Sequence, residues 1–318
     1  MTIKKDSDFT NCPKAWTTLI TNTAYLPGLL NLDYSLKKVG SKYPLVALYT
    51  DTFGPEGHAE LDARNIPKLR IEYLLPVESK DYSNDTRFYD CWTKLQPFSL
   101  VQFERVVQID SDMLVVQNMD ELMELDLGNY DFAATHACVC NPYKKPHYPS
   151  DWIAPNCAYS DGNHQQRAKV SPHLVDFTEN YNLVGPPATL SLGTCNGGLQ
   201  VVNPSREQYE KIIGALSAPE KTSNYEFADQ SLLSDVFRGN WLPLSYKYNA
   251  LKTLATFHSD LWKPEEVKNI HYIITPKPWD VTINDEEFQD DTGTFVHWWE
   301  INEQRLEAER QVDTTNQS

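Results

Sequence analysis

Short apolar segments of β-strand character alternate along this chain with segments of helical periodicity. Buried strands are predicted at 15–20, 45–49, 70–74, 105–109, 199–202 and 269–273. Between the first two, leucine recurs at the spacing of one helical face, at Leu26, Leu29, Leu32 and Leu36. Gly40 is a typical residue for the end of such a helix. The alternation predicts an α/β fold in which helices cover a mainly parallel sheet.

Further helices are predicted at 58–65, at 91–103 despite Pro97, at 204–216 and at 228–237. Asn203 is the expected N-cap of the third of these helices, with Pro204 in its first turn. Gly239 is expected to end the fourth.

Residues 137–190 interrupt this rhythm with many Pro, Asn, His and Tyr residues. We expect a long insertion there, because long irregular segments inside a compact domain are usually functional or mobile. The two polar ends, 1–11 and 312–318, are expected to be flexible. One domain is therefore predicted over 12–300.

Composition excludes several classes of protein. The chain has 318 residues with 28 Lys or Arg and 44 Asp or Glu, so its formal net charge is −16. Nothing general in so acidic a chain would attract a nucleic acid. The apolar runs are too short to span a bilayer, and residues 1–11 lack the hydrophobic core of a signal peptide. We therefore expect a cytoplasmic protein without a membrane span.

The six cysteines are expected to be free thiols, because no secretory segment accompanies them. Cys138, Cys140 and Cys157 could in principle hold zinc, with His136 or His164 as the fourth ligand. Their spacing matches no common zinc module, and buried thiols are the interpretation that we favour.

An acidic triplet, Asp110-Ser111-Asp112, directly follows the predicted strand at 105–109. Residues two apart in a strand face the same side, so an extended backbone would aim both carboxylates into one space. At the carboxyl end of a parallel strand, that space is where open α/β sheets bind ligands. Two close carboxylates repel each other unless a cation or a proton offsets them. The triplet therefore indicates a divalent metal site, with a solvated acidic turn as the alternative.

His271 lies in the last predicted strand, and Lys277 follows it between Pro276 and Pro278. The histidine is either a site residue or a hydrogen-bonded core residue. The prolines hold the backbone extended, and a stiff loop that presents one ammonium suits a phosphate. The alternative is an exposed lysine in a rigid turn.

A third constellation combines Asn196-Gly197-Gly198 with the later pair Asp229-Gln230. Paired glycines allow close backbone approach, and the amide and carboxylate side chains can bind the hydroxyls of a sugar. Asp229 and Gln230 could instead only cap the helix that follows.

Together and in this order, these segments resemble glycosyltransferase family 8, the retaining nucleotide-sugar transferases that include glycogenin and galactinol synthase. The resemblance extends from about residue 17 to residue 279. The matching segments are 18–25, 93–95, 110–112, 196–198, 227–230 and 271–279.

This resemblance implies a single-domain GT-A fold of Rossmann-like type, with the nucleotide at the carboxyl edge of the sheet. Asp110, Asp112 and His271 would bind Mn²⁺, which two carboxylates and one imidazole suit chemically. The residues that would hold the donor are Leu19, Thr21, Asn22, Tyr25, Lys94, Asp110, Ser111, Asp112, Asn196, Gly197, Gly198, His271 and Lys277. The catalytic candidates are Asp229, Gln230 and Lys277.

The implied activity is retaining, metal-dependent transfer of a hexosyl group from UDP-galactose or UDP-glucose to a hydroxyl acceptor. We expect the acceptor to be a small polyol such as myo-inositol, or a saccharide, with the insertion at 137–190 as its wall or lid. A front-face route, in which Gln230 positions the sugar, is the mechanism that we favour. A homodimer is the assembly that we consider.

Three positions depart from the family pattern. Ile274 stands where a glycine usually follows the metal histidine by three residues, and Glu226 stands at the first carboxylate of the sugar-binding pair of glycogenin. Leu254 lies near the position expected for glycogenin's acceptor tyrosine, which disfavours self-glucosylation there. The insertion and 227–230 resemble galactinol synthase more closely. The alternatives are a self-glucosylating primer that uses another tyrosine, and a non-catalytic UDP-sugar-binding scaffold.

Overall fold

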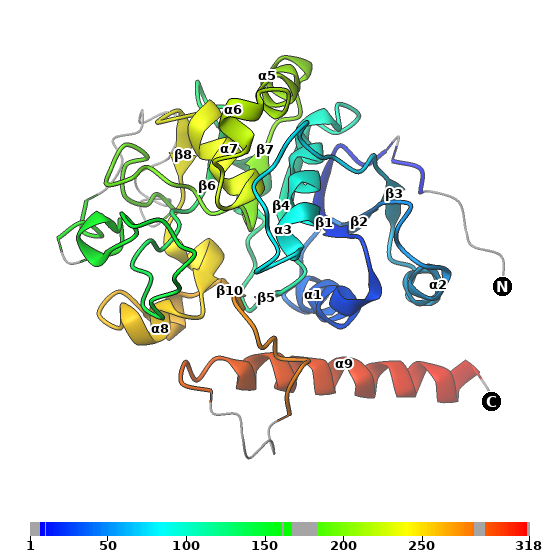
Figure 1. Ribbon diagram of the computed structural model, residues 1–318. Helices are drawn as coiled ribbons and strands as arrows, with labels where there is room; N and C mark the ends of the chain where they lie inside the picture. The colour runs from blue at the N-terminus through cyan, green and yellow to red at the C-terminus, as the bar shows by residue number, and fades with distance from the viewer. Residues whose placement is uncertain (1–6, 10, 161, 167–182, 283–289, 317–318) are drawn as a thin grey trace.

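A seven-stranded mixed sheet forms the centre of the computed structural model, which describes residues 7–9, 11–160, 162–166, 183–282 and 290–316 (Figure 1). The strands lie in the order β3-β2-β1-β4-β7-β6-β8. Their bounds are β1 (Lys14–Ile20), β2 (Leu45–Tyr49), β3 (Lys68–Arg70), β4 (Arg105–Ile109), β6 (Phe132–Ala134), β7 (Leu199–Val202) and β8 (Trp241–Pro243). Strand β7 is antiparallel to both of its neighbours, and the other pairs are parallel. The predicted α/β fold with a mainly parallel sheet is confirmed.

A second sheet of three short strands positions the later site residues. It has the order β5-β10-β9, with bounds Met113–Val115, Asn269–His271 and Ala250–Leu251 respectively. Strand β10 is antiparallel to β5, and their register places His271 opposite Met113. This pairing brings His271 beside the residues that directly follow β4.

Helices cover both faces of the large sheet. The α-helices are α1 (Leu26–Lys38), α2 (Pro55–Ala63), α3 (Arg87–Cys91), α4 (Glu121–Glu124), α5 (Arg206–Leu216), α6 (Pro219–Thr222), α7 (Ala228–Val236), α8 (Leu254–Phe257) and α9 (Phe295–Asn316). The 3-10 helices are η1 (Thr23–Tyr25), η2 (Trp92–Ser99), η3 (Ala154–Asn156), η4 (Tyr246–Asn249) and η5 (Pro264–Glu266).

Alternation along β4 divides the core between the two faces of the large sheet. Val106 belongs to the cluster that packs with η2, α5 and α7. Val107 and Ile109 belong to the cluster on the opposite face, with α1 and α4. Because successive side chains of a strand point to opposite faces, the apolar residues of the buried strand β4 contribute to both layers.

The bounds of β2, β4 and β7 match the predicted strands. Other elements differ from the prediction. Strand β3 ends at Arg70, so the predicted strand at 70–74 is displaced toward the carboxyl end. Pro97 lies inside a 3-10 helix, η2, rather than a long α-helix over 91–103, because proline lacks the N–H that an α-helix requires. Helix α5 begins after Ser205, and the Oδ1 atom of Asn203 accepts a bond from Arg105 instead of capping it.

The long helix α9 was not predicted, and it extends through Asn316 into the segment expected to be flexible. It lies beneath α1 in Figure 1, and the Asn31 amide donates to the carbonyl oxygen of Trp298 (3.2 Å). Charged pairs one turn apart, such as Arg305 with Glu309 (2.6 Å), support a helix that has little apolar periodicity.

The predicted flexible start, 1–11, lies partly outside the described residues. Within it, the Ser7 N–H donates to the carbonyl of Lys68 (3.1 Å), and the ring of Phe9 packs on Phe103. Of the insertion at 137–190, residues 161 and 167–182 also lie outside. In the described part of the chain, none of the helices has both the length and the apolar character needed to cross a bilayer.

Candidate active site

A cavity of about 480 Å³ opens beside the carboxyl ends of β1 and β4. All of the predicted site residues line it: Leu19, Thr21, Asn22, Tyr25, Lys94, Asp110, Ser111, Asp112, Asn196, Gly197, Gly198, Asp229, Gln230, His271 and Lys277. Segments that are distant in sequence therefore meet at the edge of the sheet where the α/β pattern predicts a ligand.

The acidic triplet forms a tight turn and not the extended backbone that we expected. The Met113 N–H donates to the carbonyl of Asp110 (3.2 Å), which closes the turn between β4 and β5. Both carboxylates nevertheless face His271. Its Nε2 atom lies 3.3 Å from Oδ1 of Asp112 and 3.7 Å from Oδ2 of Asp110.

A hydrogen bond on the far side of the imidazole fixes its orientation. Nδ1 of His271 lies 2.8 Å from Oδ1 of Asn249, at the end of η4. An amide oxygen only accepts, so Nδ1 carries a proton, and Nε2 is the nitrogen that faces the two carboxylates. His271 is thus held as a ligand would be, with its second nitrogen on a supporting partner.

These three side chains fit a divalent cation. Their ligand atoms all lie within 4.8 Å of one another. Two carboxylate oxygens and one imidazole nitrogen suit Mn²⁺ and similar ions, and three protein ligands leave positions for oxygens of a bound molecule.

Two lysines, the partly buried Lys94 and the buried Lys277, offset the two carboxylates. Nζ of Lys94 lies 2.7 Å from Oδ2 of Asp110, and Nζ of Lys277 lies 2.5 Å from Oδ2 of Asp112. Lys277 is only 3% exposed, which excludes the exposed lysine considered as its alternative. Each acid of the triplet therefore has its own ammonium partner, and the two carboxylates need no ion to relieve their repulsion.

Burial and charge act against each other on these groups. Burial alone would raise the pKa of Asp112, but Lys277 and His271 hold it well below its ordinary value. Burial would lower the pKa of Lys94, but Asp110 holds it well above. For Lys277 burial prevails and lowers the pKa, although Asp112 opposes the change.

The glycine turn allows two side chains to approach its backbone closely. A Cβ at Gly197 would lie 2.3 Å from Oδ2 of Asp229, and one at Gly198 would lie 2.4 Å from Cε1 of His271. Oδ1 of Asn196 accepts from the Gly198 N–H (3.0 Å). A larger residue at either position would displace the groups around it.

Asp229 and Gln230 lie in the first turn of α7 and face the glycine turn. Oε1 of Gln230 accepts from the Gly197 N–H and from the amide of Asn196, both at 3.3 Å. Asp229 is buried, and its Oδ2 atom has no hydrogen-bond partner among the described residues. Burial raises the pKa of this carboxyl to about 7. Asp229 therefore presents an unsatisfied acceptor beside the cavity, which capping a helix would not require.

The site residues predicted within 19–25 form a separate wall of the cavity. The Thr21 hydroxyl donates to Asp90 (2.8 Å), and the Tyr25 hydroxyl accepts from Arg87 (2.9 Å). Asp90 and Arg87 also line the cavity, but no sequence motif predicts them. The insertion adds further lining residues, among them Tyr148.

The structure clarifies the three departures from the family pattern. Ile274 has φ +64°, a left-handed conformation that glycine adopts far more easily, so the backbone keeps the shape expected for glycine. Glu226 pairs with Lys80 and does not line the cavity. Leu254 is fully buried at the start of α8, in the hydrophobic core.

Comparison with known proteins finds similarity to glycosyltransferases. Residues 190–282 match Glycosyl transferase family 8. Galactinol synthase 4 of Arabidopsis thaliana is 28% identical over 302 residues, which cover 93% of this chain and 83% of that protein. The uncharacterized protein R707 of Acanthamoeba polyphaga mimivirus is 25% identical over 283 residues, which cover 88% and 86% respectively.

Solved structures share the fold. The galactosyltransferase LgtC, determined with donor and acceptor sugar analogues, has a TM-score of 0.58 and 13% identity, covering 91% of this chain and 95% of that one. The glycosyltransferase GlyE of Streptococcus pneumoniae TIGR4 has a TM-score of 0.56 and 19% identity, covering 92% of this chain and 60% of that one. The chain is thus similar to glycosyltransferase family 8 over residues 190–282 and to galactinol synthases along most of its length, and these similarities support a glycosyltransferase with a GT-A fold.

Proposed function

We propose that this glycosyltransferase transfers a hexosyl group from a UDP-sugar to a hydroxyl acceptor, with retention of anomeric configuration. UDP-galactose or UDP-glucose is the proposed donor, and myo-inositol the proposed acceptor. The observation that carries the proposal is the convergence of Asp110, Asp112 and His271 beside two lysines at one cavity. Similarity to galactinol synthases over most of the chain supports the choice of donor and acceptor.

A divalent cation, which we propose is Mn²⁺, would be held by Asp110, Asp112 and His271 and would offset the negative charge of the UDP diphosphate. Lys277 supplies a second positive charge. Its ammonium is held by Asp112 and by the carbonyl of Tyr272 (2.7 Å), so it is already oriented before a ligand arrives. Charges fixed in a buried site stabilise a departing diphosphate more strongly than water can.

The sugar of the donor would lie against the glycine turn. Asp229 lines the cavity and can accept a hydrogen bond from a sugar hydroxyl, and Gln230 beside it can orient the ring. Lys94, bonded to Asp110, contributes positive charge on this side. Leu19, Thr21, Asn22 and Tyr25 would then hold the uridine, with the insertion as the acceptor wall.

For the chemical step we propose the front-face route. The acceptor oxygen attacks the anomeric carbon on the side of the leaving group, as the bond from that carbon to the β-phosphate oxygen breaks. The departing phosphate oxygen takes the proton of the acceptor hydroxyl. Gln230 has no charge with which to form a stable glycosyl ester, and its contacts to the glycine turn suit a positioning role.

The test is UDP release by the full chain with Mn²⁺ and a panel of UDP-sugars, each with and without myo-inositol. We expect one UDP-hexose to be consumed, faster with inositol, and to give an α-linked product. Asp110→Asn should slow turnover roughly a hundredfold or more, whereas Asp126→Asn, at an exposed position, should not. Hexoses added to the protein itself would indicate a primer, and donor binding without turnover would indicate a scaffold.

A further inference from the structure

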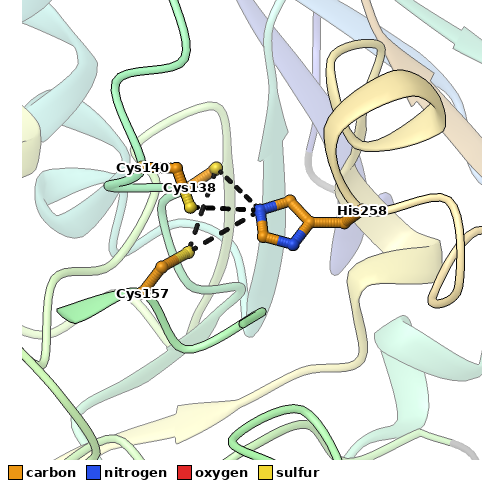
Figure 2. A group of neighbouring side chains, drawn as sticks. All are labelled: Cys138, Cys140, Cys157 and His258. Atoms are coloured by element: carbon orange, nitrogen blue, oxygen red, sulfur yellow. Dashed lines mark hydrogen bonds between the residues drawn. The ribbon is translucent and has the colours of Figure 1, made fainter. Parts of the chain in front are cut away.

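A second cluster of metal-ligating side chains lies away from the acidic triplet (Figure 2). Cys138 and Cys140 stand at the start of the insertion, and Cys157 follows η3 within it. His258 comes from a distant segment, directly after α8. Figure 2 shows the three sulfur atoms facing one nitrogen of the imidazole.

The spacing of these atoms is that of a tetrahedron. Nε2 of His258 lies 3.2 Å from the sulfur of Cys140, 3.4 Å from that of Cys138 and 4.0 Å from that of Cys157. The sulfurs of Cys138 and Cys157 are 3.9 Å apart. Around a tetrahedral zinc ion, the usual bond lengths place sulfur and nitrogen about 3.6 Å apart and two sulfurs about 3.8 Å apart.

Hydrogen bonding alone explains this arrangement poorly. An Nε2–H points at one acceptor, whereas three sulfurs surround this atom, and a thiol is a weak donor. The histidines considered as the fourth ligand are engaged elsewhere. Nε2 of His136 meets the carbonyl of Pro186 (3.0 Å), and Nδ1 of His164 meets the carbonyl of Ser160 (3.3 Å).

We propose that Cys138, Cys140, Cys157 and His258 bind one zinc ion in a closed, structural site. Three thiolates and an imidazole select a soft or borderline ion such as Zn²⁺ over Mn²⁺, whereas the carboxylate site favours harder ions. Four protein ligands leave no open position for a substrate. The two sites therefore differ in both the metal they select and the role they can play.

The proposed zinc site connects the insertion to α8, which follows strand β9 of the three-stranded sheet. On the insertion side, the cavity is lined by Cys138, Tyr143 and Tyr148. The ring of Tyr143 packs against that of Phe257, the last residue of α8, with 5.3 Å between the ring centroids. His258 is the next residue. The zinc would thus fasten one wall of the cavity to α8, within a segment that has little regular secondary structure of its own.

Metal content tests the proposal directly. The full chain, purified without a metal-affinity step and freed of loosely bound ions, should contain one zinc per molecule by elemental analysis. Cys157→Ser and His258→Ala should each lose the zinc. Cys12→Ser, a cysteine outside the cluster, should keep it. The double variant Asp110→Asn, Asp112→Asn should also keep it, which separates this site from the carboxylate site.

Cobalt provides a readout on the native sequence that needs no variant to fold. Replacing the zinc with Co²⁺ should give the visible bands of tetrahedral cobalt and the ultraviolet charge-transfer band of a cobalt thiolate. Wild-type protein that contains no zinc and shows neither band with Co²⁺ would overturn the proposal. A disulfide within the cluster, or zinc that persists in both Cys157→Ser and His258→Ala, would overturn it equally.

Discussion

The amide oxygen of Asn249 lies 2.8 Å from Nδ1 of His271 and fixes which nitrogen of the imidazole faces the acidic triplet. The same amide donates to Oδ1 of Asn196 (2.8 Å), which in turn accepts from the Gly198 N–H (3.0 Å). One side chain therefore links the proposed metal ligand to the turn proposed to hold the sugar. Asn249 itself does not line the cavity, so its role is to position other residues.

Loss of this hydrogen bond should weaken metal binding more than it destabilises the fold. For Asn249→Ala we expect the Mn²⁺ concentration for half-maximal activity to rise about 10- to 100-fold, as for other partners of metal-bound histidines. Asn249→Asp, which keeps an acceptor for Nδ1, should recover much of the affinity. Asn224→Ala, at an exposed asparagine, is the matched control. An unchanged Mn²⁺ dependence in Asn249→Ala would show that His271 needs no such support.

A methyl group at Gly198 should displace the imidazole. Its Cβ would lie 2.4 Å from Cε1 of His271 and 2.9 Å from Cε of Met113. We expect Gly198→Ala to lose most activity and to lower the free energy of unfolding by about 1–3 kcal/mol. Gly214→Ala, in an exposed part of α5 with nothing near the new atom, should instead gain about 0.5–1 kcal/mol. Denaturation and UDP release measure both effects; full activity in Gly198→Ala would contradict the proposed placement of His271.

The ionised carboxylate of Asp229 should lower the stability of the folded protein, although the proposed reaction needs it. Its pKa is raised by burial to about 7, so the ionised side chain is costly in the folded protein above that pH. The cost decreases as pH falls through 7 and is absent below the ordinary value near 4, where the carboxyl is protonated in both states. Asp229→Asn should therefore stabilise the metal-free protein at pH 8 by about 1–3 kcal/mol, and not at pH 4.

The same variant should lose turnover, because the amide presents a donor where the sugar hydroxyl needs an acceptor. Urea denaturation at both pH values, with UDP release at pH 8, measures the two effects. Asp126→Asn is the control, since that side chain is exposed. A less stable Asp229→Asn at pH 8 would show that the carboxylate is satisfied in the folded state.

Lys277 should stabilise the leaving group of the reaction. Lys277→Met removes the ammonium that lies 2.5 Å from Asp112, and we expect kcat to fall roughly a hundredfold. Because Asp112 loses its partner, its pKa should rise. Lys211→Met, at an exposed lysine, should leave kcat unchanged. Equal kcat values for Lys277→Met and the wild type would remove Lys277 from the catalytic candidates.

The sequence predicted best where one local pattern was sufficient. Short, mostly apolar runs located β2, β4 and β7, and the spacing of leucines located α1. It failed where the outcome depended on distant partners. Three-residue strands such as β5 and β6 have no period to detect, and α9 carries mostly charged and amide residues after Trp299. The turn of the acidic triplet depends on β10, which pairs with β5 from more than 150 residues further along the chain.

The candidate residues of the site came from motif order. Parallel strands bring together only the segments after β1 and β4, whereas the glycine turn precedes the antiparallel strand β7 and His271 lies in the small sheet. The complete cluster of three cysteines and His258 could not be predicted from the sequence. Cys138 and Cys140 are two residues apart in the sequence. His258 lies 118 residues beyond Cys140, and no known spacing of metal ligands relates it to the cysteines. Likewise, nothing near Asn249 in the sequence points to His271, because only the small sheet brings them together.

The proposed function depends most on a divalent cation held by Asp110, Asp112 and His271. Calorimetric titration of UDP into the wild type and His271→Ala, each with and without Mn²⁺, tests this directly. We predict that Mn²⁺ tightens UDP binding to the wild type by about tenfold or more, or about 1.4 kcal/mol, and that His271→Ala removes this gain. Equal UDP affinity with and without Mn²⁺ in the wild type, or an undiminished Mn²⁺ effect in His271→Ala, would contradict it.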